Sequence, residues 1–130
     1  MKVFSLQTCA FGFHDITRQV ELAVRESGVS EGVAVVFCPH TTAAITINEN
    51  ADPDVQRDLK LALEQTFPDR PEFAHREGNS HAHLKSSVIG ASETIPISEG
   101  RMALGIWQGI YFCEFDGPRK RRFYVQVLGG

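Results

Sequence analysis

The sequence predicts a single α+β domain that spans residues 1–130. Its length suits one ordinary domain, and 42% hydrophobic against 22% charged residues is typical of a globular chain with its own core. Two segments carry apolar residues at helical spacing, and about seven short segments favour strands. No repeat, linker or low-complexity stretch divides the chain. Two main helices against about seven strands define the α+β class.

The first third of the chain is predicted to alternate strands with one helix. Residues 3–9 form an apolar stretch that indicates a strand. Asp15 is the expected N-cap of a helix that ends at Gly28, a natural residue just after a helix C-terminus. The inward stripe of this helix consists of Ile16, Val20, Ala23 and Val24. Residues 33–37 are a continuous β-branched run typical of a buried strand, and residues 42–47 form the next strand.

A second helix is predicted from the residues at its start. Asp52 can cap it, and Pro53 suits the first helical position because the N–H that proline lacks would have no partner there. Its inward stripe is expected to consist of Val55, Leu59, Ala62 and Leu63. The polar segment 68–79 is then expected to be an exposed loop, and residues 82–89 a short helix closed by Gly90.

The last third is predicted to be β structure. The expected strands are residues 94–97, 102–104, 106–115 and 122–127. Turns are expected at Glu99-Gly100 and at residues 116–118, and the last strand is expected to pair back on 106–115 as a hairpin. Pro96 marks an edge or a bulge, because proline cannot donate a hydrogen bond to a neighbouring strand.

Composition disfavours several classes of protein. The N-terminus lacks the apolar core of a signal peptide, and no apolar run is long enough to span a bilayer. A cytoplasmic protein without a membrane partner is therefore expected. The three cysteines, an odd number set among apolar residues, indicate reduced core thiols. A formal net charge of −3 argues against a nucleic-acid partner.

Four of the five histidines fall in predicted loops or at the ends of elements, and they form the first candidate site. They are His40, His75, His81 and His83. Imidazole is the commonest neutral metal ligand, and three histidines that leave an open position are typical of catalytic zinc. His81 and His83 would share one face in an extended segment and diverge on a helix. Spacing alone favours the alternative, in which the histidines only satisfy local hydrogen bonds.

A second polar cluster, Asn48-Glu49-Asn50, follows a predicted strand and precedes a helix N-terminus. Exposed backbone N–H groups and the helix dipole favour an anion at such a place. The two asparagines can equally supply turn geometry. Glu49, at the end of a strand, can act as a general base or a metal ligand.

Gln108 and Glu114 are polar residues on a strand face whose other residues are apolar. A buried carboxylate without a partner is costly, so Glu114 needs an arginine, a metal ion or a neighbouring subunit. The basic run Arg119–Arg122 follows the next turn. It can pair with Glu114, hold an anionic ligand, or be a solvated hairpin end. A structural ion pair and a ligand site are equally supported for Glu114.

Three blocks of residues, in order along nearly the whole chain, resemble the YjbQ family. The first comprises residues 39–43 and 48–53 with Asp58, the second residues 75–87, and the third Gly100, residues 104–110, Glu114, residues 116–117 and residues 119–122. No single motif is specific to this family, but the three blocks in this order are.

The resemblance implies a homotrimer of sheet-sandwich subunits, polar sites near the subunit interfaces and a metal-binding histidine cluster. Imidazole donors suit zinc or another transition metal better than magnesium. The resemblance also implies a secondary thiamine-phosphate synthase activity, which joins a pyrimidine diphosphate to a thiazole phosphate and releases pyrophosphate. The expected substrate is then a phosphorylated small molecule. Two alternatives stay open: a metal-dependent hydrolase of another substrate, and a non-enzymatic trimer that binds a metabolite or a metal ion.

The residues and the resemblance together assign the roles at the site. The predicted catalytic residues are Glu49, Glu114 and Asn48. The predicted substrate-binding residues are Gln108, Lys85, Arg119 and Arg121. The predicted metal ligands, carried over from the resemblance, are His40, His75 and His83.

Overall fold

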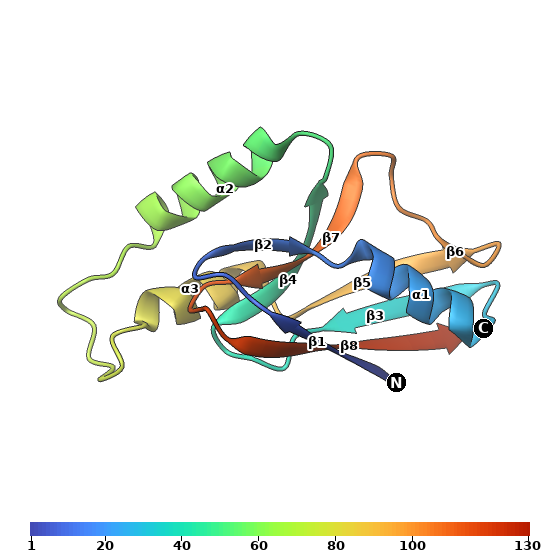
Figure 1. The fold of residues 1–130 in the computed structure, drawn as a ribbon, viewed down its shortest axis with the longest axis horizontal. Helices are drawn as coiled ribbons and strands as arrows, with labels where there is room; N and C mark the ends of the chain where they lie inside the picture. The colour runs from blue at the N-terminus through green and yellow to red at the C-terminus, as the bar shows by residue number, and fades with distance from the viewer.

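A computed structural model describes residues 1–130 and contains two antiparallel sheets and three helices (Figure 1). The five-stranded sheet has the order β1 (Lys2–Gln7), β8 (Lys120–Gly129), β3 (Gly32–Phe37), β5 (Ser92–Ser98) and β6 (Arg101–Met102). The three-stranded sheet has the order β2 (Gly12–Asp15), β7 (Gln108–Glu114) and β4 (Ala43–Glu49). The helices are α1 (Thr17–Ser27), α2 (Pro53–Thr66) and α3 (Ser80–Ile89). The predicted α+β class is confirmed, and all strand pairs of both sheets are antiparallel.

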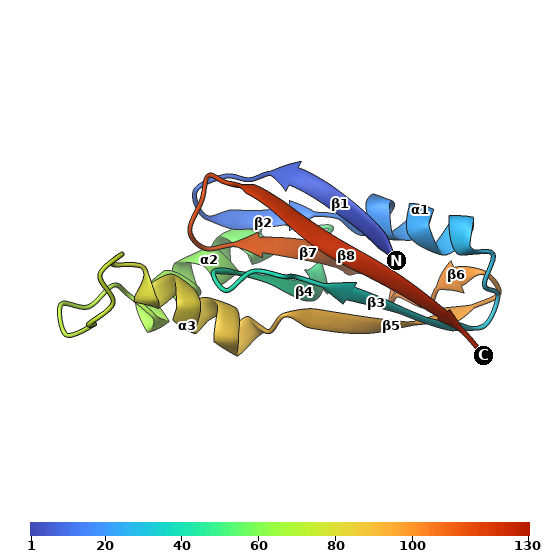
Figure 2. The ribbon, with the colours of Figure 1, turned by 90° about the horizontal axis from the view of Figure 1, so that it is seen from below.

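The elements are stacked in layers. The three-stranded sheet and α1 together cover one face of the five-stranded sheet (Figure 2). Side chains of α1 and both sheets fill the space between these layers, and Val20, Ile45, Phe112 and Phe123 are at most 1% exposed. A smaller cluster lies on the other face of the three-stranded sheet, where α3 and α2 pack; its members are Ala44, Ala82, Cys113 and Phe115.

Helix α1 ends at Gly28 and buries the stripe that its sequence predicts, but its N-cap is Ile16, without a capping side chain, and not the predicted Asp15. Asp15 Oδ1 accepts the Thr17 N–H at 2.9 Å. Gly28 adopts a left-handed conformation with φ 69°, and its N–H donates to the Arg25 carbonyl. All four predicted inward residues are buried: Ile16, Val20, Ala23 and Val24.

Helix α2 begins as predicted but buries less than predicted. The Asp52 side chain accepts the Asp54 N–H at 2.9 Å. No residue of α2 is buried, and Ala62 of the expected stripe is exposed. The helix extends away from the sheets in Figure 1, so only one side of it meets the rest of the chain. The amide of Gln56 anchors it by donating to the Tyr111 hydroxyl at 2.6 Å.

The predicted hairpin between residues 106–115 and the last strand is wrong. Strand β8 pairs with β1 and β3, whereas β7 pairs with β2 and β4. Because β7 already has a neighbour on both sides, it has no free edge, and the turn at residues 116–119 carries the chain into the other sheet. The strand β2 was not predicted; it has only four residues. Helix α3 begins at Ser80, two residues earlier than expected.

One face of the five-stranded sheet is uncovered. In β3, Ala34 and Val36 face the core and are 0% exposed, but Phe37 on the opposite face is 42% exposed. Val3 and Leu128 are likewise about half exposed, at 51% and 52%. The expectation that residues 33–37 are buried on both faces is therefore wrong for the single chain.

The cysteines divide into two classes. Cys38 and Cys113 are buried free thiols, and burial raises the pKa of Cys38 to about 11. Cys9 is exposed in the connection between β1 and β2, with its Sγ 3.3 Å from His14 Nε2. The prediction of core thiols is confirmed for two residues and wrong for Cys9. None of the three helices combines the length and the apolar character that a membrane-spanning helix requires.

Candidate functional site

The predicted site residues divide between the two ends of the β4–β7 pair. Ala43 faces Glu114 at one end, and Glu49 faces Gln108 at the other. The two ends are roughly 20 Å apart, given the rise per residue of an antiparallel strand. We call the first the ion-pair end, after Glu114 and Arg121, and the second the cleft end, after the cleft beside Gln108.

At the ion-pair end, Glu114 and Arg121 form a closed buried network. Arg121 donates to both carboxylate oxygens of Glu114, from Nε at 2.7 Å and from Nη2 at 2.6 Å. The Thr8 hydroxyl donates to one oxygen at 2.5 Å, and the Asp116 N–H donates to the other at 3.0 Å. Thr42 Oγ1 accepts from Arg121 at 2.8 Å. The Glu114 side chain is 0% exposed and that of Arg121 is 6% exposed.

This network determines the charge of Glu114. Burial alone would raise the pKa of its carboxyl group. The hydrogen bonds from Arg121, Thr8 and the Asp116 N–H outweigh burial and hold the pKa below its ordinary value. Of the roles predicted for Glu114, the structure contains the arginine pair. Neither Glu114 nor Arg121 lies where a substrate would contact it in this conformation.

His40 lies beside the same network, and its ring is held by the neighbouring strand. Its Nε2 accepts the Arg122 N–H at 3.0 Å, and its ring meets the edge of Phe112 at a centroid distance of 6.3 Å. Burial, followed by the positive charge of Arg121, lowers the pKa of His40. One ring nitrogen is thus already used within the chain.

The start of α3 forms a polar cluster near the turn that follows β7. Asn79 Nδ2 donates to Asp116 Oδ2 at 2.8 Å, and Arg119 Nη2 donates to the same oxygen at 3.0 Å. Asn79 is 8% exposed, and its Oδ1 has no hydrogen-bond partner. It precedes α3 without capping it through its side chain, so the first N–H groups of the helix, beginning at Ser80, have no capping side chain.

Two of the three predicted metal ligands meet beside this cluster. The rings of His75 and His83 lie at a centroid distance of 5.5 Å and an angle of 81°. Because α3 is helical here, His81 diverges from His83, and its Nδ1 lies 3.7 Å from Asp69.

His40 does not join the other two. It contacts Phe112 in the core between the sheets, whereas α3 packs on the opposite face of the three-stranded sheet. No group of three or more His, Cys, Asp or Glu side chains is arranged to hold a metal ion. One chain therefore provides an imidazole pair, and the predicted three-histidine site does not fit within a single chain.

Lys85, a predicted substrate-binding residue, is buried in the structure. Its side chain is 1% exposed, and its Nζ donates to Glu64 Oε1 at 2.6 Å. The ammonium also lies over the ring of Phe11, 5.0 Å from the centroid. Lys85 thus links α3 to α2 and faces no open surface.

At the cleft end, the predicted polar residues shape the chain. Asn48 Oδ1 accepts the Glu49 N–H at 2.8 Å, and Glu49 Oε2 accepts the Asp52 N–H at 3.2 Å. Gln108 Oε1 accepts the Gly105 N–H at 2.7 Å. These contacts match the turn-forming role that the sequence allowed for Asn48. They also keep Glu49 far from the histidine pair.

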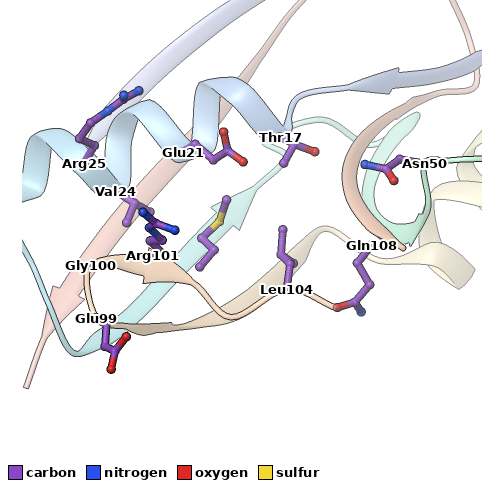
Figure 3. A pocket seen from close by; sticks show the side chains of 11 residues that line it. Thr17, Glu21, Val24, Arg25, Asn50, Glu99, Gly100, Arg101, Leu104 and Gln108 are labelled. Carbon is purple, nitrogen blue, oxygen red and sulfur yellow. The ribbon is translucent and has the colours of Figure 1, made fainter. Parts of the chain in front are cut away.

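Beside Gln108 lies a cleft of about 690 Å³, which no pattern in the sequence indicates. It is bounded by α1, the turn after β4 and the β5–β6 hairpin (Figure 3). A second hollow, of about 590 Å³, shares Thr17, Glu21 and Asn50 with it. The α1 side chains recur at Thr17, Glu21 and Arg25, the polar face of that helix. The four-residue spacing of these polar side chains is visible in the sequence. No residue near them in the sequence indicates that the β5–β6 hairpin packs opposite this face of α1.

The fold and these two polar regions define a class of small α+β sandwich proteins with an ionic network at one end and an open cleft at the other. Comparison with known proteins identifies the class. The chain belongs to the family described as UPF0047 protein YjbQ-like, whose model matches residues 2–130.

Two relatives are similar in sequence to this chain over most of their length. YugU of Bacillus subtilis is 53% identical over 116 residues, 88% of each chain. A UPF0047 protein of Methanocaldococcus jannaschii is 55% identical over 115 residues, 88% of this chain and 83% of that one. Both carry the family designation without a stated activity.

Solved structures share the fold. An uncharacterised YjbQ/UPF0047 protein of Clostridium acetobutylicum is 56% identical, with a TM-score of 0.96 over 98% of this chain and 100% of that one. A related protein of unknown function from Sulfolobus solfataricus is 34% identical, with a TM-score of 0.95 over 99% and 96%.

Proposed function

We propose that the chain is an enzyme that acts on a phosphorylated small molecule at the start of α3, with thiamine-phosphate synthase as its reaction type. The observation that carries the proposal is the convergence of three features there: a helix start without a capping side chain, the His75–His83 pair and Arg119. Free N–H groups at a helix start and a guanidinium are the donors that phosphate oxygens prefer.

In this proposal, the chain's own groups bind and stabilise the departing pyrophosphate. Arg119 has a half-exposed guanidinium that Asp116 orients, and the α3 N–H groups provide further donors. His75 and His83 are less buried than Lys85 and Glu114, so they are the side chains that can exchange protons or donate hydrogen bonds to the substrate. Glu49, Asn48 and Gln108 lie at the other end of β4–β7 and have no part in this step.

We further propose that the chain forms a homotrimer and that a transition-metal ion, zinc by preference, binds between its subunits, with ligands from two of them. His75 and His83 would be two of its ligands, and a group from a neighbouring subunit would supply the remainder. A metal ion so held would neutralise phosphate charge. The uncovered face of the five-stranded sheet, with Val3, Phe37 and Leu128 half exposed, supports assembly, since an apolar face of this kind is typical of an interface.

The test combines metal analysis, light scattering and a pyrophosphate-release assay with the pyrimidine diphosphate and the thiazole phosphate. His83→Gln and His75→Gln should each lose bound metal and most turnover. His40→Gln is the matched control and should keep both, because His40 lies outside the pair. Metal retained by His83→Gln but lost by His40→Gln would contradict the assignment. A wild-type trimer that releases no pyrophosphate would contradict the proposed reaction.

Arg119 provides an independent test of anion binding. Arg119→Gln should weaken pyrophosphate binding about tenfold or more, as expected for a charge-assisted hydrogen bond. Arg122→Gln, an exposed arginine on β8, is the control and should change binding little. Equal binding by the wild type and Arg119→Gln would place the anion elsewhere.

A further inference from the structure

The cleft between α1 and the β5–β6 hairpin has the volume of a small-ligand site and a largely polar lining. Its volume of about 690 Å³ falls in the range of sites for small molecules. Apolar side chains contribute to its lining, and polar groups stand on both sides (Figure 3). The apolar lining residues are Val24, Met102 and Leu104. It lies at the cleft end of β4–β7, so it is separate from the site proposed at the start of α3.

Two opposite charges face this cleft from opposite sides without pairing. Glu21 of α1 and Arg101 of β6 both project into the space between helix and hairpin in Figure 3. Neither makes a salt bridge or a side-chain hydrogen bond within the chain, so their charged atoms are more than 4.0 Å apart. Arg25 and Glu99 border the same cleft but point away from it. The chain therefore holds one negative and one positive group across an open gap.

An amide side chain, that of Asn50, also lines this gap. The Asn50 side chain lies against Gly109, where an added Cβ would come within 2.9 Å of Asn50 Cβ and 3.0 Å of its Nδ2. A side chain at position 109 would thus displace Asn50, which makes no side-chain hydrogen bond of its own. Thr17 is held rigidly, because its hydroxyl donates to Asp15 at 2.6 Å and accepts the Ile110 N–H at 2.9 Å.

We propose that this cleft binds a small zwitterion of the amino-acid type. Arg101 binds the ligand's carboxylate, Glu21 binds its ammonium group, and the amide of Asn50 hydrogen-bonds beside them. The apolar lining contacts an aliphatic side chain. A ligand with both charges bridges two groups that do not pair with each other in this structure, which a simple anion or a simple amine does not do.

The experiment is an NMR titration of the full chain with three probes: L-leucine, N-acetyl-L-leucine and L-leucinamide. The second probe lacks the cation and the third lacks the anion. L-leucine should shift the backbone amide signals of Thr17, Glu21 and Arg101. Each of the other two probes should bind about tenfold or more weakly, since each loses one charge-assisted contact.

Matched variants separate the two contacts. Arg101→Gln should make L-leucine and L-leucinamide bind equally within about twofold, and Glu21→Gln should do the same for L-leucine and N-acetyl-L-leucine, as in a double-mutant cycle. Arg25→Gln and Glu99→Gln are the controls, because both residues border the cleft but point away from it. They should leave all three affinities within about twofold of the wild type.

Several outcomes would overturn the proposal. One is an absence of shifts at the cleft with L-leucine in the folded wild type. Another is an L-leucine to L-leucinamide ratio that Arg101→Gln leaves unchanged. If inorganic phosphate shifts the same signals and L-leucine does not, the cleft is a plain anion site and the zwitterion assignment is wrong. None of these outcomes depends on turnover at the α3 site.

Discussion

A glutamate and an arginine lie at each end of the β4–β7 pair, buried and paired with each other at one end and unpaired beside a cleft at the other. At the ion-pair end, Glu114 and Arg121 are buried, and each has its partners within the chain. At the cleft end, Glu21 and Arg101 face each other across an open gap and have none. A glutamate and an arginine thus support the fold in one place and remain available to a ligand in the other.

The difference follows from where each charge lies relative to water. A buried charge must be neutralised by a partner, because its transfer out of water is costly. An exposed charge keeps its hydration and needs no partner in the chain. Free charges gathered around a cleft therefore indicate binding more strongly than buried ones. Glu114 and Arg121, predicted as catalytic and substrate-binding residues, are therefore weaker candidates for binding than charged groups that a ligand can reach.

The largest expected effect comes from breaking the buried pair. Glu114→Gln leaves the Arg121 guanidinium buried without a countercharge, so the free energy of unfolding should fall by about 3–5 kcal/mol. Urea unfolding followed by circular dichroism measures this. A midpoint equal to the wild type would contradict the structural role of Glu114.

A double variant checks that the loss comes from the orphaned charge. Glu114→Leu combined with Arg121→Met removes both charges and should recover most of the stability lost in Glu114→Gln. If the double variant is no more stable than the single one, the hydrogen bonds to Thr8 and the Asp116 N–H matter more than the ion pair.

A smaller effect is expected from pH. The pKa of Glu114 in the folded chain lies below its ordinary value of 4.5, so the folded state takes up this proton at lower pH than the unfolded state. Its contribution to stability is therefore fully present above about pH 4.5 and is lost as the pH falls through the folded pKa. Wild type should lose stability faster than Glu114→Gln as the pH is lowered from about 5.

Two histidines, His14 and His40, contribute to the same pH profile. Burial lowers the pKa of both His14 and His40 below 6.5, so both proteins should begin to lose stability near pH 6.5 as the unfolded state takes up protons. Because the Glu114 charge raises the pKa of both histidines, the difference between the wild-type and Glu114→Gln curves contains this coupling as well as the contribution of the Glu114 carboxyl group. Parallel curves below pH 5 would show that its carboxyl group is not coupled to folding.

Much of the fold was predictable because its signals are local. The caps at Gly28 and Asp52 and the apolar stripe of α1 depend on neighbouring residues and appear as expected. The pairing of β8 was not predictable, because it depends on β7 having its two neighbours already. Only the assembled sheets contain that information.

The candidate site was predictable only in part, for the same reason. Burial predicts that Glu114 needs an arginine, a metal ion or a neighbouring subunit, and the structure shows that Arg121 is its partner. The separation of His40 from His83 depends on which face of the three-stranded sheet each segment occupies, which no spacing reveals. The cleft was missed because Glu21 and Arg101 are 80 positions apart and each resembles an ordinary solvated charge.

The smallest expected effect is on the stability of variants at the cleft end. Arg101→Gln and Glu21→Gln should each change the free energy of unfolding by no more than about 0.5 kcal/mol, as is usual for surface substitutions without a buried partner. The same urea assay measures both, with Glu114→Gln as the sensitive reference. A loss of several kcal/mol in either variant would mean that the cleft charges support the fold, and the contrast between the two ends would fail. Stability near wild type, together with altered L-leucine binding, would separate a charge used for folding from one kept for a ligand.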